Sequence, residues 1–182
     1  MISIIAGQGT MILCCIFYIV WWYRCYRPGT AVDRSHGLNG LLLFLIIVSG
    51  FGGIALSFRP LSFKEELLLD DDILLGVTAV VFAVMLAVTL FIFRRKVTSE
   101  LFIITLWTSL ETAVCNRMCA GSLVSHTEYT VGCIVIAVSF IISMIMYVLY
   151  YRMEENRAFH AATVPLYAAA FSAFVLLVMT IL

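Results

Sequence analysis

Charged residues are scarce in this chain of 182 residues. They make up 12% of it, and 11 basic residues balance 11 acidic ones. Hydrophobic residues account for 63%, and the mean hydropathy is +1.08. Both values lie outside the range of soluble globular proteins. The sequence therefore predicts an integral membrane protein whose first partner is the lipid bilayer, and we expect no nucleic-acid partner.

Sequence motifs of common enzymes are absent as well. The chain has no HExxH, GxSxG, GxGxxG or P-loop motif, and no CxxC among its six cysteines. These absences exclude the usual sites for zinc proteases, serine hydrolases, nucleotides and dithiol chemistry. The acidic run Asp70–Asp72 is interpreted as a solvated loop, because three consecutive acids cannot all face one ion. We expect no cofactor and no metal, and the interpretation favours a protein that is not an enzyme.

Six hydrophobic runs are long enough to cross a membrane as helices. A bilayer core of roughly 30 Å needs about 20 apolar residues per helix. The connections between the runs are too short to fold independently. The sequence predicts an all-α bundle of about six transmembrane helices that forms one domain, residues 1–182. The predicted spans are Ile2–Tyr23, Leu38–Ser57, Ile73–Phe93, Leu101–Ser122, Thr130–Tyr150 and Ala158–Leu182.

Basic residues gather in alternate connections, which predicts the orientation of the chain. By the positive-inside rule these connections are cytoplasmic, so both termini lie outside. No cationic segment precedes the first run and no small-residue cleavage site follows it, which indicates a retained anchor rather than a signal peptide. We expect a multi-pass protein of the cell (inner) membrane. The residues that set the orientation are Arg24, Arg27, Arg34, Arg94, Arg95, Lys96, Arg152 and Arg157.

The fourth hydrophobic run carries a glutamate near its middle. Glu111 is roughly ten residues from either end of the run, and on a helix it shares a face with Trp107, Thr108 and Cys115. A charged carboxylate at this depth costs about 2.5–3.5 kcal/mol. We therefore predict that Glu111 faces other helices and is protonated, paired with another group or wetted by a cavity. A structural hydrogen bond between helices is the alternative.

Asn116 and Arg117 follow in the same run, closer to its outer end. An arginine at this depth can extend its charged group to the membrane surface, and an asparagine can cap a helix or bond a neighbour. We interpret both residues as structural.

Two other runs contain residues that favour an irregular helix near mid-depth. The second run carries SGFGG, Ser49–Gly53, and the sixth carries Pro165 with Tyr167 just beyond it. Glycine permits close approach, and proline removes a backbone donor. We predict that both spans depart from regular helix and meet Glu111, and close helix packing is the alternative. The candidate ligand or ion pathway is Ser49, Gly50, Gly52, Gly53, Thr108, Glu111, Cys115 and Tyr167.

The cysteines are interpreted mainly as small apolar packing residues. Cys119 and Cys133 lie near the outer surface on either side of a short connection, where they form either a disulfide or two free thiols. The sequence alone leaves both alternatives open.

The function predicted from these features is that of a transporter, channel or transport subunit for a small solute or cation, with Glu111 as the central polar group. It acts alone, as a homo-oligomer or within a larger membrane complex. The alternative is a noncatalytic membrane subunit that packs against a larger assembly, and a membrane-embedded enzyme is the third interpretation.

Overall fold

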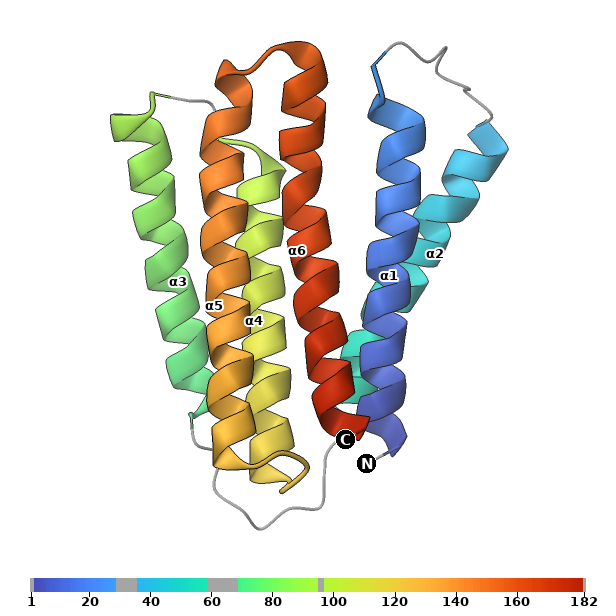
Figure 1. Ribbon diagram of the computed structural model, residues 1–182, viewed down its shortest axis with the longest axis vertical. Helices are drawn as coiled ribbons and strands as arrows, with labels where there is room; N and C mark the ends of the chain where they lie inside the picture. The colour runs from blue at the N-terminus through green and yellow to red at the C-terminus, as the bar shows by residue number, and fades with distance from the viewer. Residues whose placement is uncertain (1, 29–35, 59–68, 95–96, 182) are drawn as a thin grey trace.

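The computed structural model describes residues 2–28, 36–58, 69–94 and 97–181, and the regular elements in these ranges are helices. A π-helical turn, η1 (Val88–Ile92), extends α3, and a 3₁₀ turn, η2 (Tyr150–Arg152), follows α5. The predicted all-α bundle is confirmed, with helix ends within a few residues of the predicted ones (Figure 1). The helices are α1 (Ile2–Tyr26), α2 (His36–Ser57), α3 (Asp71–Ala87), α4 (Ser99–Ala120), α5 (His126–Leu149) and α6 (Glu155–Ile181).

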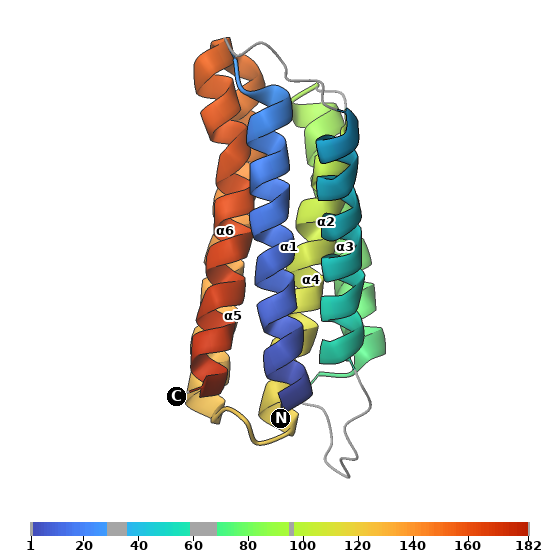
Figure 2. The same cartoon turned by 90° about the vertical axis from the view of Figure 1, so that its right-hand side faces the viewer.

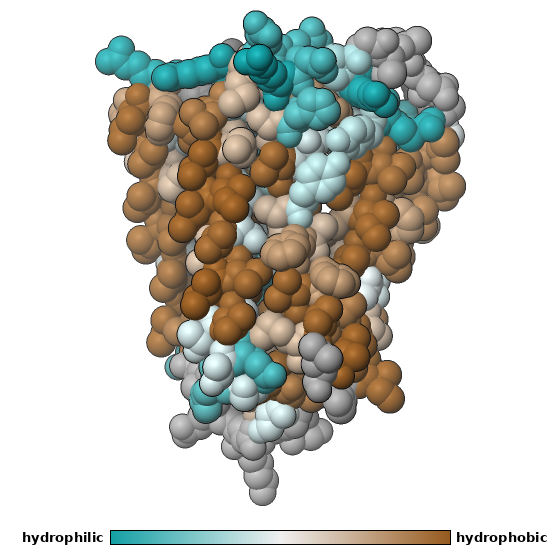
Figure 3. Space-filling model, viewed as in Figure 1, coloured by the Kyte–Doolittle hydropathy of each residue, from teal (hydrophilic) through white to brown (hydrophobic). Residues whose placement is uncertain are grey.

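The outer surface of the bundle is suited to a membrane. Five helices, all except α4, are long and apolar enough to cross a bilayer. In Figure 3 a broad hydrophobic band crosses the middle of the visible face, and hydrophilic side chains gather mainly at the upper end. An apolar band between polar ends matches the hydrocarbon core and its two interfaces.

Helix α4 is less apolar because other helices surround it. It carries Glu100, Glu111 and Arg117, yet nine of its side chains are buried. It packs against α3, α5 and α6, and its Met118 accepts a hydrogen bond from Gln8 of α1. The two ribbon views agree, because α4 lies behind α5 and α6 in Figure 1 and behind α1 and α2 in Figure 2. Polar side chains on α4 are therefore directed mainly at protein rather than lipid.

Most of the described basic residues lie at one end of the bundle, which we call the basic end. There α1 ends with Arg24 in its last turn, Arg94 follows η1, and Arg152 closes η2 (Figure 1, top). Both chain termini lie at the opposite end. This arrangement agrees with the alternation in the sequence, and the assignment of the basic end to the cytoplasm stays a prediction. Outside the described residues lie Arg34, Arg59, Lys64, Arg95 and Lys96.

The glycine segment of α2 packs against α1. A Cβ atom on Gly53 would lie 2.7 Å from Cγ of Met11 and 3.0 Å from the carbonyl oxygen of Gly7. Helix α2 stays α-helical throughout Ser49–Gly53, and α6 stays α-helical through Pro165. The predicted departure from regular helix was therefore wrong. A side chain at Gly53 has no room because two backbones cross closely here, as small residues allow in membrane helices.

This crossing gives a testable prediction for two adjacent glycines. Gly53→Ala should lower the melting temperature in detergent, because overpacking typically costs about 1–3 kcal/mol. Gly52→Ala is the matched control, since its added Cβ would lie 3.9 Å from Cγ2 of Thr10, an ordinary contact. Equal melting temperatures for both variants would contradict the tight crossing.

Asn116 and Arg117 attach the start of α3 to the end of α4. Asn116 is fully buried; its Nδ2 donates to the carbonyl oxygen of Leu69 at 2.6 Å, and its Oδ1 accepts from the Leu69 amide at 3.3 Å. Nη2 of Arg117 forms an ion pair with Asp71 at 2.6 Å, and its guanidinium lies over the ring of Phe58. The prediction that the asparagine bonds a neighbour is confirmed.

Candidate functional site

A cavity of about 220 Å³ lies beside α4 near the middle of the bundle, and Glu111 forms part of its wall. Helices α1, α2, α4, α5 and α6 contribute to it, and most of the wall is apolar. We call this the central cavity. Its residues are Cys14, Cys15, Tyr18, Ile46, Ile103, Ile104, Trp107, Thr108, Glu111, Ser139, Phe140, Ser143, Pro165, Leu166, Ala169 and Ser172.

The Glu111 side chain is held through one of its two carboxylate oxygens. Only 2% of the residue is exposed. Its Oε1 accepts hydrogen bonds from Nε1 of Trp107 at 2.7 Å and from Oγ of Ser172 at 2.9 Å. Trp107 is one turn earlier on α4, and Ser172 belongs to α6. The local helix and a neighbouring helix therefore fix the position of the carboxyl group.

The second oxygen of Glu111, Oε2, has no hydrogen-bond partner in the described part of the chain, and no described cation lies within ion-pair distance of the carboxyl group. The Ser172 hydroxyl is also within reach of the carbonyl oxygens of Ala168 and Ala169, at 3.0 and 3.1 Å. Because a serine hydroxyl has one proton, Trp107 is the more constant donor. At Oε2 this carboxyl group can take up a proton, bind a cation or accept a hydrogen bond from an N–H group of a ligand.

Thr108 and Cys115, predicted to share a stripe with Glu111, lie in different surroundings. Thr108 lines the central cavity, and its hydroxyl donates to the carbonyl oxygen of Ile104 at 2.9 Å. Sγ of Cys115 is fully buried against α5, only 2.9 Å from where a Cβ on Gly132 would lie. Thr108 is thus a neighbour of the carboxyl group in the wall, and Cys115 is a packing contact farther along α4.

The other predicted site residues lie away from Glu111. Ser49 donates to the carbonyl oxygen of Leu45 on its own helix. The hydroxyl groups of Tyr167 and Tyr23 are 3.0 Å apart, and Tyr167 is 48% exposed. Gly50, Gly52 and Gly53 belong to the contact between α1 and α2 described above. The structure therefore brings together Glu111 and Thr108, and places the remaining members of the predicted pathway elsewhere.

A second, much smaller void lies beyond Glu111, toward the end that holds the termini. A void of about 10 Å³ lies between Gln8 and Glu111, which is room for one water at most. Gln8 is buried; its Nε2 donates to Sδ of Met118 at 2.9 Å, and its Oε1 accepts from Oγ1 of Thr180 at 3.5 Å. These contacts between α1, α4 and α6 close the bundle on that side.

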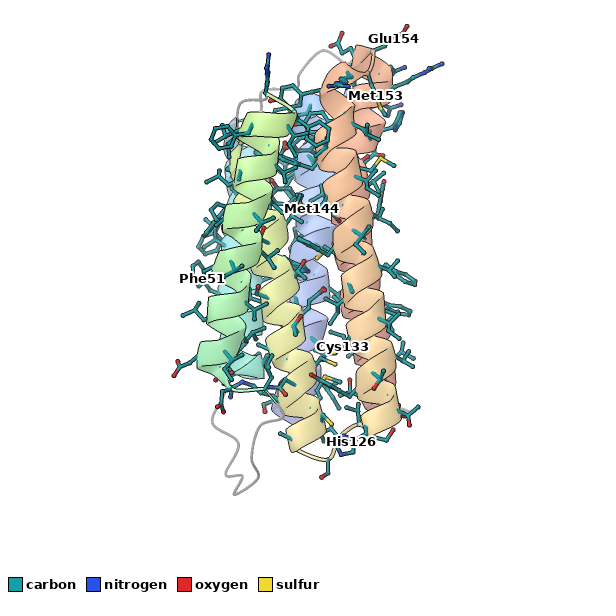
Figure 4. All side chains as sticks on the ribbon, turned by 90° about the vertical axis from the view of Figure 1, so that its left-hand side faces the viewer. Phe51, His126, Cys133, Met144, Met153 and Glu154 are labelled. Atoms are coloured by element: carbon teal, nitrogen blue, oxygen red, sulfur yellow. The ribbon has the colours of Figure 1, made fainter. Side chains whose placement is uncertain are left out.

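The cysteines are free thiols. Cys119 lies with its Sγ 3.9 Å from Nδ1 of His126, and Cys133 is about two turns farther along α5 (Figure 4). Within the described ranges, no three His, Cys, Asp or Glu side chains are grouped so that they could hold a metal ion. We therefore interpret Cys119, His126 and Cys133 as packing residues near the end of the bundle that holds the termini.

Comparison with models of known protein families, with curated proteins and with solved structures finds no match to this chain. The apolar helices and the polar bundle ends define it as a multi-spanning membrane protein.

Proposed function

We propose that the protein transports a small solute or cation, alone or as the membrane subunit of a transport complex, and that Glu111 is the binding group in the central cavity. The observation that supports this most directly is the buried carboxyl group with one oxygen fixed and the other unpartnered. Intramembrane acids facing a bundle interior commonly serve ion or substrate pathways. The membrane we propose is the cell (inner) membrane.

The shape of the interior supports transport. The hydroxyl groups of Thr108 and Ser143 in the cavity wall donate to carbonyl oxygens on their own helices, whereas the Ser172 hydroxyl also donates to the Glu111 carboxyl group. The cavity is wide on one side of Glu111 and almost closed on the other. A binding group near mid-depth between packed helices is typical of transporter sites.

A cavity-filling variant tests this proposal. Purified protein is reconstituted into liposomes that contain a mixture of small neutral, cationic and anionic solutes, and the retained solutes are measured by mass spectrometry. We expect the wild type to release at least one solute faster than protein-free liposomes, and Ala169→Phe to stop that release by filling the cavity. Ala55→Phe is the control, because Ala55 is exposed on the outer face of α2.

Failure of the wild type to release any solute faster than protein-free liposomes would contradict independent transport. It would favour the second candidate, a noncatalytic subunit. One observation supports that candidate: no side chain between Asp71 and Ala87 of α3 is buried, so this helix leaves most of its surface to lipid or to another protein. A partner retained in equal amount during purification from native membranes would then be expected.

A further inference from the structure

The wall of the central cavity offers one free carboxylate oxygen and is otherwise mostly apolar. That oxygen is Oε2 of Glu111, while Oε1 already accepts two hydrogen bonds. The hydroxyl groups of Thr108 and Ser143 donate to carbonyl oxygens on their own helices, at 2.9 and 2.7 Å. Of the described residues that line the cavity, none is a lysine, an arginine or a histidine. The cavity therefore favours a cation over an anion, and a ligand with few polar groups, because each further polar group would be buried without a partner.

The volume of the central cavity limits the size of this ligand. An apolar cavity of about 150 Å³ accommodates benzene. At about 220 Å³ the central cavity has room for a molecule of about ten non-hydrogen atoms. A bare metal ion would leave most of this space empty and would need several oxygen ligands. An organic cation with an apolar body therefore suits the cavity better than a metal ion does.

Three aromatic side chains line the same cavity: Tyr18 from α1, Trp107 from α4 and Phe140 from α5. The face of an aromatic ring attracts an organic cation. A protonated tertiary amine has one N–H group, which can donate to Oε2 of Glu111, and three alkyl groups, which can contact the rings and the apolar wall. A quaternary ammonium ion has no N–H group, and a primary one would bring three N–H groups to a single free carboxylate oxygen.

The central cavity reaches the outer surface of the bundle between α2 and α4. Ile46 of α2 and Ile103 of α4 both belong to its wall, and Ile103 is 41% exposed. Helix α2 packs mainly on α1, so no close helix contact seals this side of the cavity. The neighbouring side chains Ile47 and Phe102 are exposed and apolar as well. In a membrane this surface faces lipid, and an apolar molecule can pass from the hydrocarbon core into the cavity without crossing the polar ends of the bundle.

We propose that the cargo is a lipophilic tertiary amine of about ten non-hydrogen atoms, which enters the central cavity from the bilayer between α2 and α4 and binds at Oε2 of Glu111. This inference rests on the proposed transport function and names its substrate class. The free carboxylate oxygen selects the single N–H group, the rings select the positive charge, and the lateral opening selects a molecule that dissolves in lipid.

A proton transfer completes the binding. The amine leaves the hydrocarbon core as a neutral base and meets the neutral carboxyl group of Glu111. Because Oε1 accepts from Trp107 and Ser172, the carboxyl proton is on Oε2. The O–H bond at Oε2 breaks, and the lone pair of the amine nitrogen forms an N–H bond with the same proton. The ammonium ion and the carboxylate then form a pair that is neutral overall, so neither charge is buried alone at this depth.

The test compares three compounds of nearly the same shape. Binding of radiolabelled N,N-dimethylbenzylamine to the full-length protein is measured at equilibrium in lipid nanodiscs, and empty nanodiscs give the amount dissolved in lipid. Isobutylbenzene, which has a C–H group in place of the nitrogen, and benzyltrimethylammonium, which has no N–H group, are the competitors. We expect the amine to bind, and each competitor to displace it at least about tenfold less well than the unlabelled amine.

Three results would overturn the inference. The first is no binding of the amine above the lipid background. The second is equal competition by isobutylbenzene, which would show that the cavity selects apolar shape alone. The third is equal competition by benzyltrimethylammonium, which would show that the N–H group is not recognised.

Variants show where the amine is held. Glu111→Gln should weaken binding by about tenfold or more, because it removes the charged partner. Phe140→Leu should weaken it by about fivefold, because it removes a ring from the wall. Glu154→Gln removes an exposed acid at the basic end (Figure 4), and Phe102→Leu removes an exposed ring of α4 outside the cavity. Both controls should bind the amine as the wild type does, and a loss in Glu154→Gln equal to that in Glu111→Gln would assign the binding to surface charge and overturn the site.

The route of entry is tested by the rate at which bound and free amine exchange, measured by NMR. Ile46→Trp adds bulk at the opening between α2 and α4 and should slow the exchange about tenfold. Ile47→Trp, at the exposed neighbouring position, should exchange the amine as the wild type does. Ala162→Trp adds bulk to a smaller pocket of about 40 Å³ toward the basic end and should also leave the rate unchanged. Slower exchange in Ala162→Trp, with Ile46→Trp as fast as the wild type, would overturn entry from the bilayer.

The outcomes separate this inference from the transport proposal. Release of another solute that Ala169→Phe blocks, without binding of the amine, would overturn the substrate class and leave transport standing. Binding of the amine at Glu111 by a protein that releases no solute from liposomes would support the ligand class and contradict independent transport.

Discussion

Glu111→Gln should yield a folded protein that no longer binds or transports its solute. The amide oxygen of glutamine can accept the hydrogen bonds of Trp107 and Ser172 in place of Oε1, so the link between α4 and α6 survives. The amide nitrogen replaces the unpartnered Oε2, however, and the side chain can no longer carry a charge. Loss of a charged partner weakens binding of a cation by about tenfold or more.

Glu111→Leu provides the comparison that separates a binding role from a structural one. Leucine leaves Nε1 of Trp107 without the acceptor that it has in the wild type at 2.7 Å. A donor left unsatisfied in this way costs about 1–3 kcal/mol, so the melting temperature should fall. Transport and melting temperature are measured for both variants in one detergent and one lipid mixture. A fully active glutamine variant would show that Glu111 only joins helices.

The helices of this protein could be predicted from sequence because the bilayer imposes a simple rule on length and apolarity. Helix α4 shows where the rule weakens. Its polar residues are tolerated because four other helices shield it, and that shielding depends on tertiary contacts that hydropathy does not encode. The depth of Glu111 could be read from its distance to the ends of the run, since rise per residue is fixed in a helix.

The partners of Glu111 were only partly predictable. Trp107 is four residues away and on the same helix face, so spacing indicates the contact. Ser172 is 61 residues away, within the run AAAFSA that reads as close packing, and no local signal distinguishes it from other small residues. The glycines of α2 pose a similar difficulty, because a kink, a solute contact and a close helix crossing all favour glycine.

Glu100 was overlooked because it lies in RRKVTSE, which reads as a connection between two spans. The structure starts α4 at Ser99, so Glu100 is already in its first turn. Helix periodicity then places it on the face of Glu111. A shift of two residues in the predicted start of a helix was enough to assign Glu100, which lines a small pocket at the basic end, to a loop.

Asn116→Leu should destabilise the bundle more than Arg117→Met does at the neighbouring position. The substitution removes both hydrogen bonds to Leu69 and leaves a backbone N–H and a carbonyl group without these partners. Each unsatisfied group costs about 1–3 kcal/mol when buried. We expect a clear fall in melting temperature.

Arg117→Met is the matched control. The Arg117 and Asp71 side chains are 21% and 50% exposed, and an exposed ion pair of this kind contributes about 0–1 kcal/mol. Methionine keeps a long apolar side chain beside Phe58, so most of the packing contact is retained. Thermal unfolding of both variants in the same detergent measures the difference. If Arg117→Met lowered the melting temperature as much as Asn116→Leu, the buried amide would not be the main attachment of α3 to α4, and the surface ion pair would take that role.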